Sequence, residues 1–143
     1  MRLQKLSHAT YQHQYHLVWG TKYRRKWLKP YIKPYLVEFV YEFEKHYPTV
    51  KILALNTDED HVHIQIEIPP DIAVTKVVQM LKQNSSRQIR KKYAFIRRMY
   101  LEDSIWAVGY YSSTVGLNED QIRKYIEHQG KEELPQQVDL GFS

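Results

Sequence analysis

The chain has 143 residues, of which 43% are hydrophobic and 26% charged, and none is cysteine. This composition predicts one compact domain and excludes disulfide-stapled folds, thiolate metal sites and cysteine nucleophiles. No apolar stretch approaches the ~20 residues of a membrane-spanning helix, and the lack of cysteine is compatible with a reducing cytoplasm.

The hydrophobic pattern predicts the order strand, helix, strand, strand, helix, strand, helix. Predicted strands cover 11–20, 51–57, 61–68 and 104–115. Predicted helices run from an entry at Pro30 and Pro34 to about residue 46, from 73 to about 92, and from 118 to 129. The last helix is expected to begin at Asn118 as N-cap and to end before Gly130 as the C′ residue. We therefore predict an α+β, ferredoxin-like (RRM-like) βαββαβ antiparallel sheet with helices on one face and an added C-terminal helix. Residues 1–133 would form this single domain, and residues 134–143 a polar tail.

Basic residues are segregated along the chain, which carries a net charge of +5. The stretches 19–37 and 72–101 contain no acidic residue and together hold 14 of the 21 lysines and arginines. Clustered cations favour a polyanionic partner, because binding to phosphates releases counterions. Two solvated helix faces or loops would give the same pattern, so charge favours a nucleic-acid partner without establishing one.

The segment 60–68 alternates strictly between polar and apolar side chains. In a strand, this pattern makes one face wholly apolar and places His61 and His63 side by side on the other. Two neighbouring imidazoles can share one metal cation. The pattern also fits a solvated polar strand face, and the local sequence leaves both interpretations open.

The last predicted helix carries Ile122, Tyr125, Ile126 and Gln129 on one face. A glutamine that ends an apolar stripe makes sense where that end of the helix meets a polar site. A phenol with an ordinary pKa near ~10 is a poor nucleophile at neutral pH, but a nearby cation favours the phenolate. On periodicity alone, Tyr125 fits a packing aromatic better than a nucleophile.

Four segments decide between these interpretations when they are taken together. They are 15–25 near the start, 60–63 in the middle, and 105–116 and 122–129 late in the chain. In these segments, the sequence resembles the single-strand transposases of the IS200/IS605 insertion-sequence family, members of the HUH (histidine–hydrophobe–histidine) tyrosine endonucleases. The resemblance covers nearly the whole chain.

The resemblance implies a site and a reaction. His61 and His63 would bind a divalent metal, Mg²⁺ or Mn²⁺, with Gln129 as the third protein ligand, and Asp60 would orient the ring of His61. Tyr125 would attack the scissile phosphate of single-stranded DNA and form a 5′-phosphotyrosine link, which a 3′-hydroxyl later attacks to reseal the strand. Since imidazole is an unusual donor for Mg²⁺, phosphate oxygen and water would complete the metal's ligands.

The resemblance also implies partners: single-stranded DNA with hairpin ends, and a second copy of the chain in a homodimer whose active sites are shared between subunits. A prokaryotic cytoplasm would be the location. The predicted DNA contacts come from both basic stretches. They are Lys22, Arg24, Arg25, Lys82, Asn84, Ser86 and Arg87.

Three alternatives remain beside this interpretation. A REP-associated tyrosine transposase shares the motifs but usually carries a longer C-terminal extension. An RRM-like binding module without catalysis uses the same scaffold but would not need both histidines, Tyr125 and Gln129. A nucleotidyl transferase with a histidine nucleophile would not need Tyr125. One departure from the family pattern is the acidic segment 58–60 before the histidine pair, where many relatives have Pro-Asp.

Overall fold

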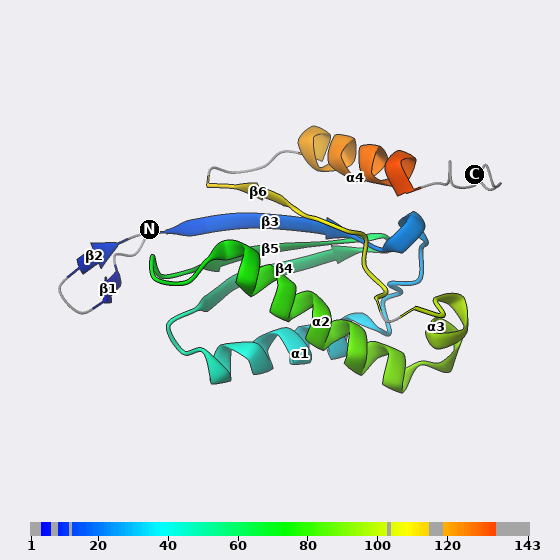
Figure 1. The fold of residues 1–143 in the computed structure, drawn as a ribbon, viewed down its shortest axis with the longest axis horizontal. Helices are drawn as coiled ribbons and strands as arrows, with labels where there is room; N and C mark the ends of the chain where they lie inside the picture. Colours follow the sequence, from blue (N-terminus) through cyan, green and yellow to red (C-terminus); the bar gives the residue numbers. More distant parts are fainter. Residues whose placement is uncertain (1–3, 7–8, 12, 103, 115–118, 134–143) are drawn as a thin grey trace.

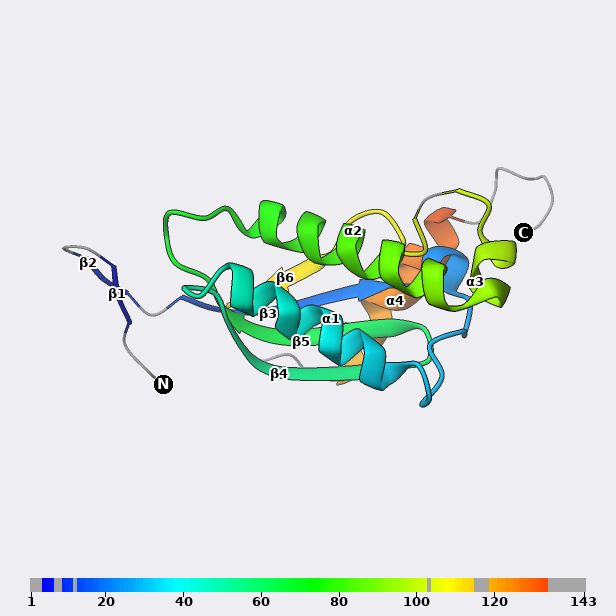
Figure 2. The same ribbon diagram turned by 90° about the horizontal axis from the view of Figure 1, so that it is seen from below.

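The fold is an antiparallel sheet with helices on both faces, shown in Figures 1 and 2. This computed structural model describes residues 4–6, 9–11, 13–102, 104–114 and 119–133, and side chains within 13–102, 104–114 and 120–128. The elements are β1 (Gln4–Leu6), β2 (Ala9–Tyr11), β3 (Gln14–Gly20), η1 (Lys22–Arg24), α1 (Lys33–His46), β4 (Lys51–Asp58), β5 (His61–Glu67), α2 (Val74–Lys92), α3 (Ala94–Met99), β6 (Tyr111–Ser113) and α4 (Glu119–Glu133).

The main sheet has four strands in the order β4-β5-β3-β6, and every neighbouring pair is antiparallel. With α1 between β3 and β4 and α2 between β5 and β6, this is the ferredoxin-like arrangement predicted from the sequence. Helices α1 and α2 lie side by side on one face of the sheet, and α4 crosses the other face (Figures 1 and 2). The predicted fold class is therefore confirmed.

The hydrophobic core lies between the sheet and the pair α1 and α2. On β5, Val62, Ile64 and Ile66 are fully buried, as the strict alternation of the sequence requires. On α1 the buried residues recur at helical spacing, and Pro34 occupies the first turn, where its missing N–H costs nothing. The buried residues of α2 are Val77, Val78, Leu81, Ser85, Ser86 and Ile89.

The fourth strand is much shorter than predicted. Instead of 104–115, β6 covers only Tyr111–Ser113, and Trp106 forms an isolated bridge to Thr21. Gly109 has a φ of 89°, a left-handed conformation that interrupts an extended strand. Upstream of it, Ile105, Trp106 and Ala107 are buried as a core segment, which explains their strand-like apolar pattern.

Other boundaries also differ from the prediction. The first long strand starts at Gln14 because Tyr11 belongs to β2, which pairs with β1 in a separate hairpin. The short helices η1 and α3 were not predicted. α4 continues past Gly130 to Glu133, so Gly130 does not end the helix; a glycine inside a helix costs only about 1 kcal/mol, and good helix formers follow it. Asn118 and the tail 134–143 lie outside the described residues. None of the described helices is long and apolar enough to cross a membrane.

Candidate active site

The histidine pair lies on the face of the sheet opposite α1 and α2. His61 and His63 are half-buried on β5, while Val62 between them is fully buried on the other face. In the register of the sheet, His61 pairs with Asp58 on β4 and with Gly20 on β3. Since paired residues share a face, the acidic Asp58 and the side-chain-free Gly20 flank the first histidine. The sheet therefore presents both imidazoles to one surface, as predicted.

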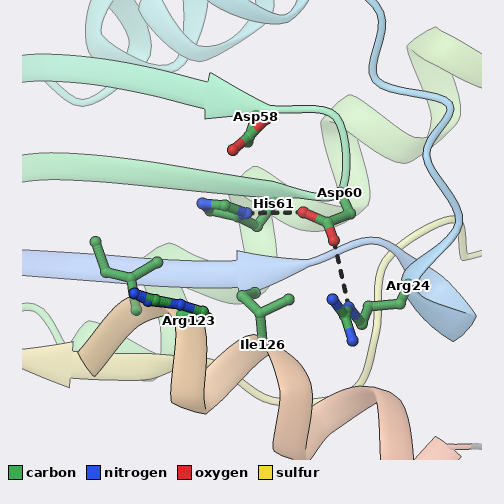
Figure 3. A pocket seen from close by; sticks show the side chains of 7 residues that line it. Arg24, Asp58, Asp60, His61, Arg123 and Ile126 are labelled. Carbon is green, nitrogen blue, oxygen red and sulfur yellow. Dashed lines mark hydrogen bonds and ion pairs between the residues drawn. The ribbon is translucent and has the colours of Figure 1, made fainter. Parts of the chain in front are cut away.

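The ring of His61 is held by a chain of polar contacts. His61 Nδ1 lies 2.9 Å from Asp60 Oδ1, and Arg24 Nε donates to Asp60 Oδ2 at 3.3 Å (Figure 3). The hydrogen bond from His61 lowers the pKa of Asp60, helped by the charges of His61 and Arg24, although burial acts in the opposite direction. With Asp60 ionised, Nδ1 of His61 is the donor, and Nε2 keeps its lone pair.

His63 has a different neighbour. His63 Nε2 lies 3.2 Å from Nδ1 of His16, a residue of β3, and the two ring centroids are 5.4 Å apart. One of these nitrogens must carry the proton and the other accept it, so the two imidazoles fix each other's tautomer. Sequence analysis did not single out His16, although it falls on the same face of its strand as Gln14 in the alternation of β3. Only the strand pairing reveals that this face meets His63.

Helix α4 covers the part of this face that lies over β3. A Cβ placed on Gly20 would lie 3.3 Å from Ile126 Cδ1 and 3.4 Å from the Asp60 carbonyl, so the glycine permits close approach of the helix. A pocket of about 270 Å³ lies between α4 and the start of β5 (Figure 3). Its lining residues are Arg24, Asp58, Asp60, His61, Ile122, Arg123 and Ile126. His61 therefore shares this pocket with two cations, Arg24 and Arg123. Sequence analysis did not identify Arg123 as a residue of the site.

Tyr125 of α4 packs against Tyr111 of β6 and is not a lining residue of this pocket. Its ring contacts Tyr111 of β6 edge to face, with centroids 5.7 Å apart. Because β3 separates β6 from β5, these strands are about 10 Å apart. Tyr125 is not among the residues that line the pocket of His61. Within one chain, the structure brings together His61, Asp60 and Arg24 but does not bring Tyr125 into their pocket. The side chain of Gln129 lies outside the described residues.

The predicted DNA contacts around η1 already have partners within the chain. Lys22 forms an ion pair with Glu102, whose pKa is lowered by this hydrogen bond. Arg25 donates to the Met99 carbonyl at 3.0 Å, and its guanidinium lies over the rings of Tyr23 and Tyr100. Arg24 and Arg25 are nevertheless exposed, so both are placed to contact a ligand on this surface.

The predicted contacts on α2 divide into surface and structural residues. Arg87 is exposed and donates to Asn84 Oδ1 at 2.6 Å. Lys82 donates to the carbonyls of Ala107 and Gly109, so it supports the segment before β6. Ser86 is only 3% exposed, and its hydroxyl accepts the Ile105 N–H at 3.2 Å. The prediction of a DNA contact is wrong for Ser86, because helical spacing turns it into the core.

The fold and site together define a ferredoxin-like domain with an imidazole pair on the sheet face that its C-terminal helix crosses. The sequence profile of the family described as "Transposase IS200 like" matches residues 9–129. The chain therefore belongs to the IS200-like transposase family, as its resemblance predicted. It is a transposase and so a DNA-processing enzyme.

Individual relatives agree with this assignment. The chain is 32% identical over 128 residues to the transposase for insertion sequence element IS200 of Salmonella typhimurium, covering 90% of this chain and 84% of the relative. It is similar to the crystal structure of a Deinococcus radiodurans protein assigned as a transposase, with a TM-score of 0.79, 26% identity and coverage of 88% and 97% of the two chains. A REP-associated tyrosine transposase bound to a REP hairpin shares the fold, with a TM-score of 0.56, 14% identity and coverage of 97% of this chain and 81% of that chain.

Proposed function

We propose that this transposase cleaves and rejoins single-stranded DNA at the ends of an insertion sequence through a 5′-phosphotyrosine intermediate. The observation that carries the proposal is the imidazole pair on the sheet face that α4 crosses. Asp60 holds His61 in the tautomer in which Nδ1 carries the proton and the lone pair of Nε2 can bind a metal. The family assignment supplies the DNA substrate class. Residues of the chain supply the nucleophile and the metal donors.

The side chains present fit a divalent metal. His61 offers Nε2 because Nδ1 is bound by Asp60. His63 stands two residues along the same strand, about 6.6 Å away at the backbone, and offers Nδ1 when its Nε2 donates to His16. Within the part of the chain that is described, no group of three His, Cys, Asp or Glu side chains is placed to hold a metal. A pair needs further donors, for which we propose the amide of Gln129 and the DNA phosphate. Two imidazoles favour Mn²⁺ over Mg²⁺ by donor type.

Tyr125 performs the covalent step in this proposal. The phenolate Oη attacks the scissile phosphorus, the bond from phosphorus to the 3′-oxygen breaks, and the leaving oxygen takes a proton to become a 3′-hydroxyl. A bound divalent cation would stabilise charge on the phosphate oxygens and favour the phenolate. In the second step, a 3′-hydroxyl attacks the phosphotyrosine and releases Tyr125. The phosphoester bond is exchanged rather than hydrolysed, so ATP is not required.

We further propose that the enzyme works as a homodimer with shared active sites. Two features support this arrangement: Tyr125 contacts Tyr111 beyond β3, and the pocket of His61 is lined instead by Ile122, Arg123 and Ile126. A copy of α4 from the partner subunit, approaching the pocket of His61 from another direction, would supply the tyrosine that does not line this pocket within one chain.

Hairpin DNA is the proposed substrate beyond the cleavage site. The REP-associated relative was solved with a REP hairpin, and the two basic stretches of this chain give it a surface for phosphates. Arg24 in η1, Arg25 directly after it and Arg87 on α2 are exposed and remain the proposed contacts. Removing one such phosphate contact should weaken binding to all hairpins alike and reduce its salt dependence.

A covalent-adduct assay tests the proposed chemistry. The protein is incubated with labelled single-stranded oligonucleotides that carry the flanking hairpin and with Mn²⁺, and adducts are separated on a denaturing gel. We expect an adduct with the wild type that disappears in Tyr125→Phe and in EDTA. Tyr111→Phe is the matched control, because it removes the hydroxyl of the ring that touches Tyr125. An adduct that persists in Tyr125→Phe would move the nucleophile elsewhere, first to a histidine.

An RRM-like binding module is less compatible with the structure. RRM domains read single strands on an open sheet surface. Here Val18 and Gly20 on the same face as the histidines are buried, and Ile126 of α4 packs against this part of β3. Hairpin binding without an adduct under any condition would nevertheless favour such a module.

A further inference from the structure

The turn after β3 has an unusual backbone. Tyr23 and Arg24 are consecutive residues with φ values of 60° and 58°, in the left-handed region. Bulky L-residues rarely adopt this conformation, because Cβ then crowds the backbone, and such strain persists only where the surroundings enforce it. Strained backbone conformations are concentrated at functional sites, so this turn is a candidate for a functional role in addition to connecting β3 to the following segment.

Several contacts enforce the turn. Thr21 Oγ1 donates to the Arg25 carbonyl at 2.6 Å, and Arg24 N donates to the Thr21 carbonyl at 3.0 Å, so the turn is closed from within. From outside, the Tyr100 hydroxyl donates to the Lys22 carbonyl at 2.5 Å, and Lys22 N donates to the Ile105 carbonyl at 2.9 Å. The conformation is therefore held by the buried residues Tyr100 and Ile105 as well as by the turn itself.

The turn forms hydrogen bonds with both the backbone and the side chain of Asp60. Thr21 N donates to the Asp60 carbonyl at 2.9 Å, and Arg24 Nε donates to Asp60 Oδ2 at 3.3 Å. The other carboxylate oxygen, Oδ1, is the one that meets His61 Nδ1 at 2.9 Å. Asp60 is only 8% exposed, so its carboxylate has little water with which to exchange these contacts. Each oxygen of Asp60 thus has its own partner, one on either side.

We infer that Arg24 is a positioning residue for His61 and acts through Asp60. The left-handed turn aims the guanidinium at Oδ2, which fixes the carboxylate plane so that Oδ1 accepts from Nδ1–H of His61. The imidazole is thereby kept in the Nδ1–H tautomer, with the lone pair of Nε2 available. This role rests on the proposed function of His61 as a metal donor. It differs from the DNA contact expected of Arg24 as one member of a basic stretch.

The choice of arginine follows from the geometry. Nε and the two terminal nitrogens of a guanidinium lie in one plane, so an Nε–H bond to Asp60 also fixes the direction of the rest of the group. Arg24 lines the same pocket as His61 (Figure 3). A lysine would place one rotatable ammonium there and would not define the carboxylate plane. Compared with Arg24→Ala, Arg24→Lys should therefore bring back the positive charge but not the Nδ1–H tautomer of His61.

A double-mutant cycle tests the role of Arg24 with two readouts. The first is the tautomer of His61 in metal-free protein, measured by ¹⁵N NMR of histidine-labelled samples and assigned with His61→Gln. The second is the Mn²⁺ dissociation constant, measured by electron paramagnetic resonance. The proteins are the wild type, Arg24→Ala, Asp60→Ala, the double variant, and Lys26→Ala as a control that removes an exposed cation from the same stretch.

The expected result is a mixed tautomer of His61 in Arg24→Ala and a Mn²⁺ dissociation constant raised roughly tenfold, as for other residues that orient metal ligands. In the Asp60→Ala background, the same Arg24→Ala change should alter the constant by less than about twofold, because the relay is already broken. Lys26→Ala should match the wild type in both readouts.

The inference is overturned if Arg24→Ala leaves the tautomer of His61 unchanged, or if it weakens Mn²⁺ binding equally in both backgrounds. If Arg24→Ala does not fold, Arg24→Met keeps the aliphatic part of the side chain without an N–H donor and replaces it in the cycle. A wild type that binds no Mn²⁺ would contradict the proposed metal site instead, and the tautomer in metal-free protein would still decide the role of Arg24.

Discussion

The two faces of β5 are made by one strand but differ completely in chemistry. Toward α1 and α2, Val62, Ile64 and Ile66 are fully buried against the core. Toward α4, the half-buried His61, His63 and Gln65 alternate with them. Strand geometry places the side chains that build the core and those available for chemistry on opposite faces. A substitution on one face therefore does not directly alter the contacts of side chains on the other.

This separation implies that substitutions on the two faces should fail in different ways. Changes on the apolar face should lower the free energy of unfolding and leave the folded molecules active. Changes on the histidine face should remove activity and leave stability nearly unchanged. The following variants test this contrast in order of decreasing effect.

His61→Ala should have the largest effect. It removes a proposed metal donor, and loss of the metal's charge stabilisation is expected to slow adduct formation roughly 10³-fold, or about 4 kcal/mol. The melting temperature should change by no more than about 3 °C, because His61 is only half-buried. The two measurements are the single-turnover rate of adduct formation and a thermal melt. Near-normal adduct formation in this variant would exclude His61 from the reaction.

Ile64→Ala should show the opposite behaviour. The side chain is fully buried, and its truncation leaves a cavity that should cost about 3 kcal/mol of unfolding free energy. Chemical denaturation measures this loss. The rate of adduct formation per folded molecule, measured well below the melting temperature, should stay within about twofold of the wild type. A large loss of that rate would show that the two faces are coupled.

Ile126→Ala should loosen α4 alone. Ile126 is 2% exposed and packs over Gly20, so its truncation should lower the local stability of the helix by about 2 kcal/mol. Hydrogen exchange should become faster in residues 120–128 and stay unchanged in α2. Lys124→Ala, an exposed change on the same helix, is the matched control. Equal acceleration in both helices would mean that α4 is part of the main cooperative unit.

Asp60→Asn should have the smallest effect, and the effect should depend on pH. The pKa of Asp60 is lowered in the folded protein, first by the hydrogen bond from His61, so the ionised form stabilises the fold. This contribution, about 1 kcal/mol for a charged hydrogen bond, is present above the ordinary pKa and is lost as pH falls through the folded value. Urea denaturation in EDTA should therefore separate wild type from variant at pH 6, and the difference should shrink as pH falls below the ordinary pKa of an aspartate. A constant difference would contradict this linkage.

Sequence reasoning succeeded where one local pattern governs the structure. The alternation of residues 61–67 predicted β5 and its histidine face, and the spacing of Val77, Val78 and Leu81 predicted α2. In both elements, the period of the apolar residues matches the geometry of the backbone. The fold class followed from the order of such elements.

Features that depend on contacts between distant segments could not be predicted in this way. His16 meets His63 only through the pairing of β3 with β5. Arg24 reaches Asp60 from a left-handed turn that Tyr100 and Ile105 hold from another part of the chain. Ser86 is polar in sequence but turns into the core and accepts the Ile105 N–H. A basic stretch therefore contains both surface and structural residues, and composition does not separate them.

Subunit complementation tests the central claim most directly, because it asks whether the histidine pair and Tyr125 serve one reaction from different chains. The variants His61→Ala/His63→Ala and Tyr125→Phe, each expected to be inactive alone, are co-expressed with different tags and purified as mixed assemblies. We predict that adduct formation returns and that the DNA is attached only to the chain that lacks the histidines. Mixed assemblies that form no adduct, although the same tagged wild-type pair does, would contradict shared active sites.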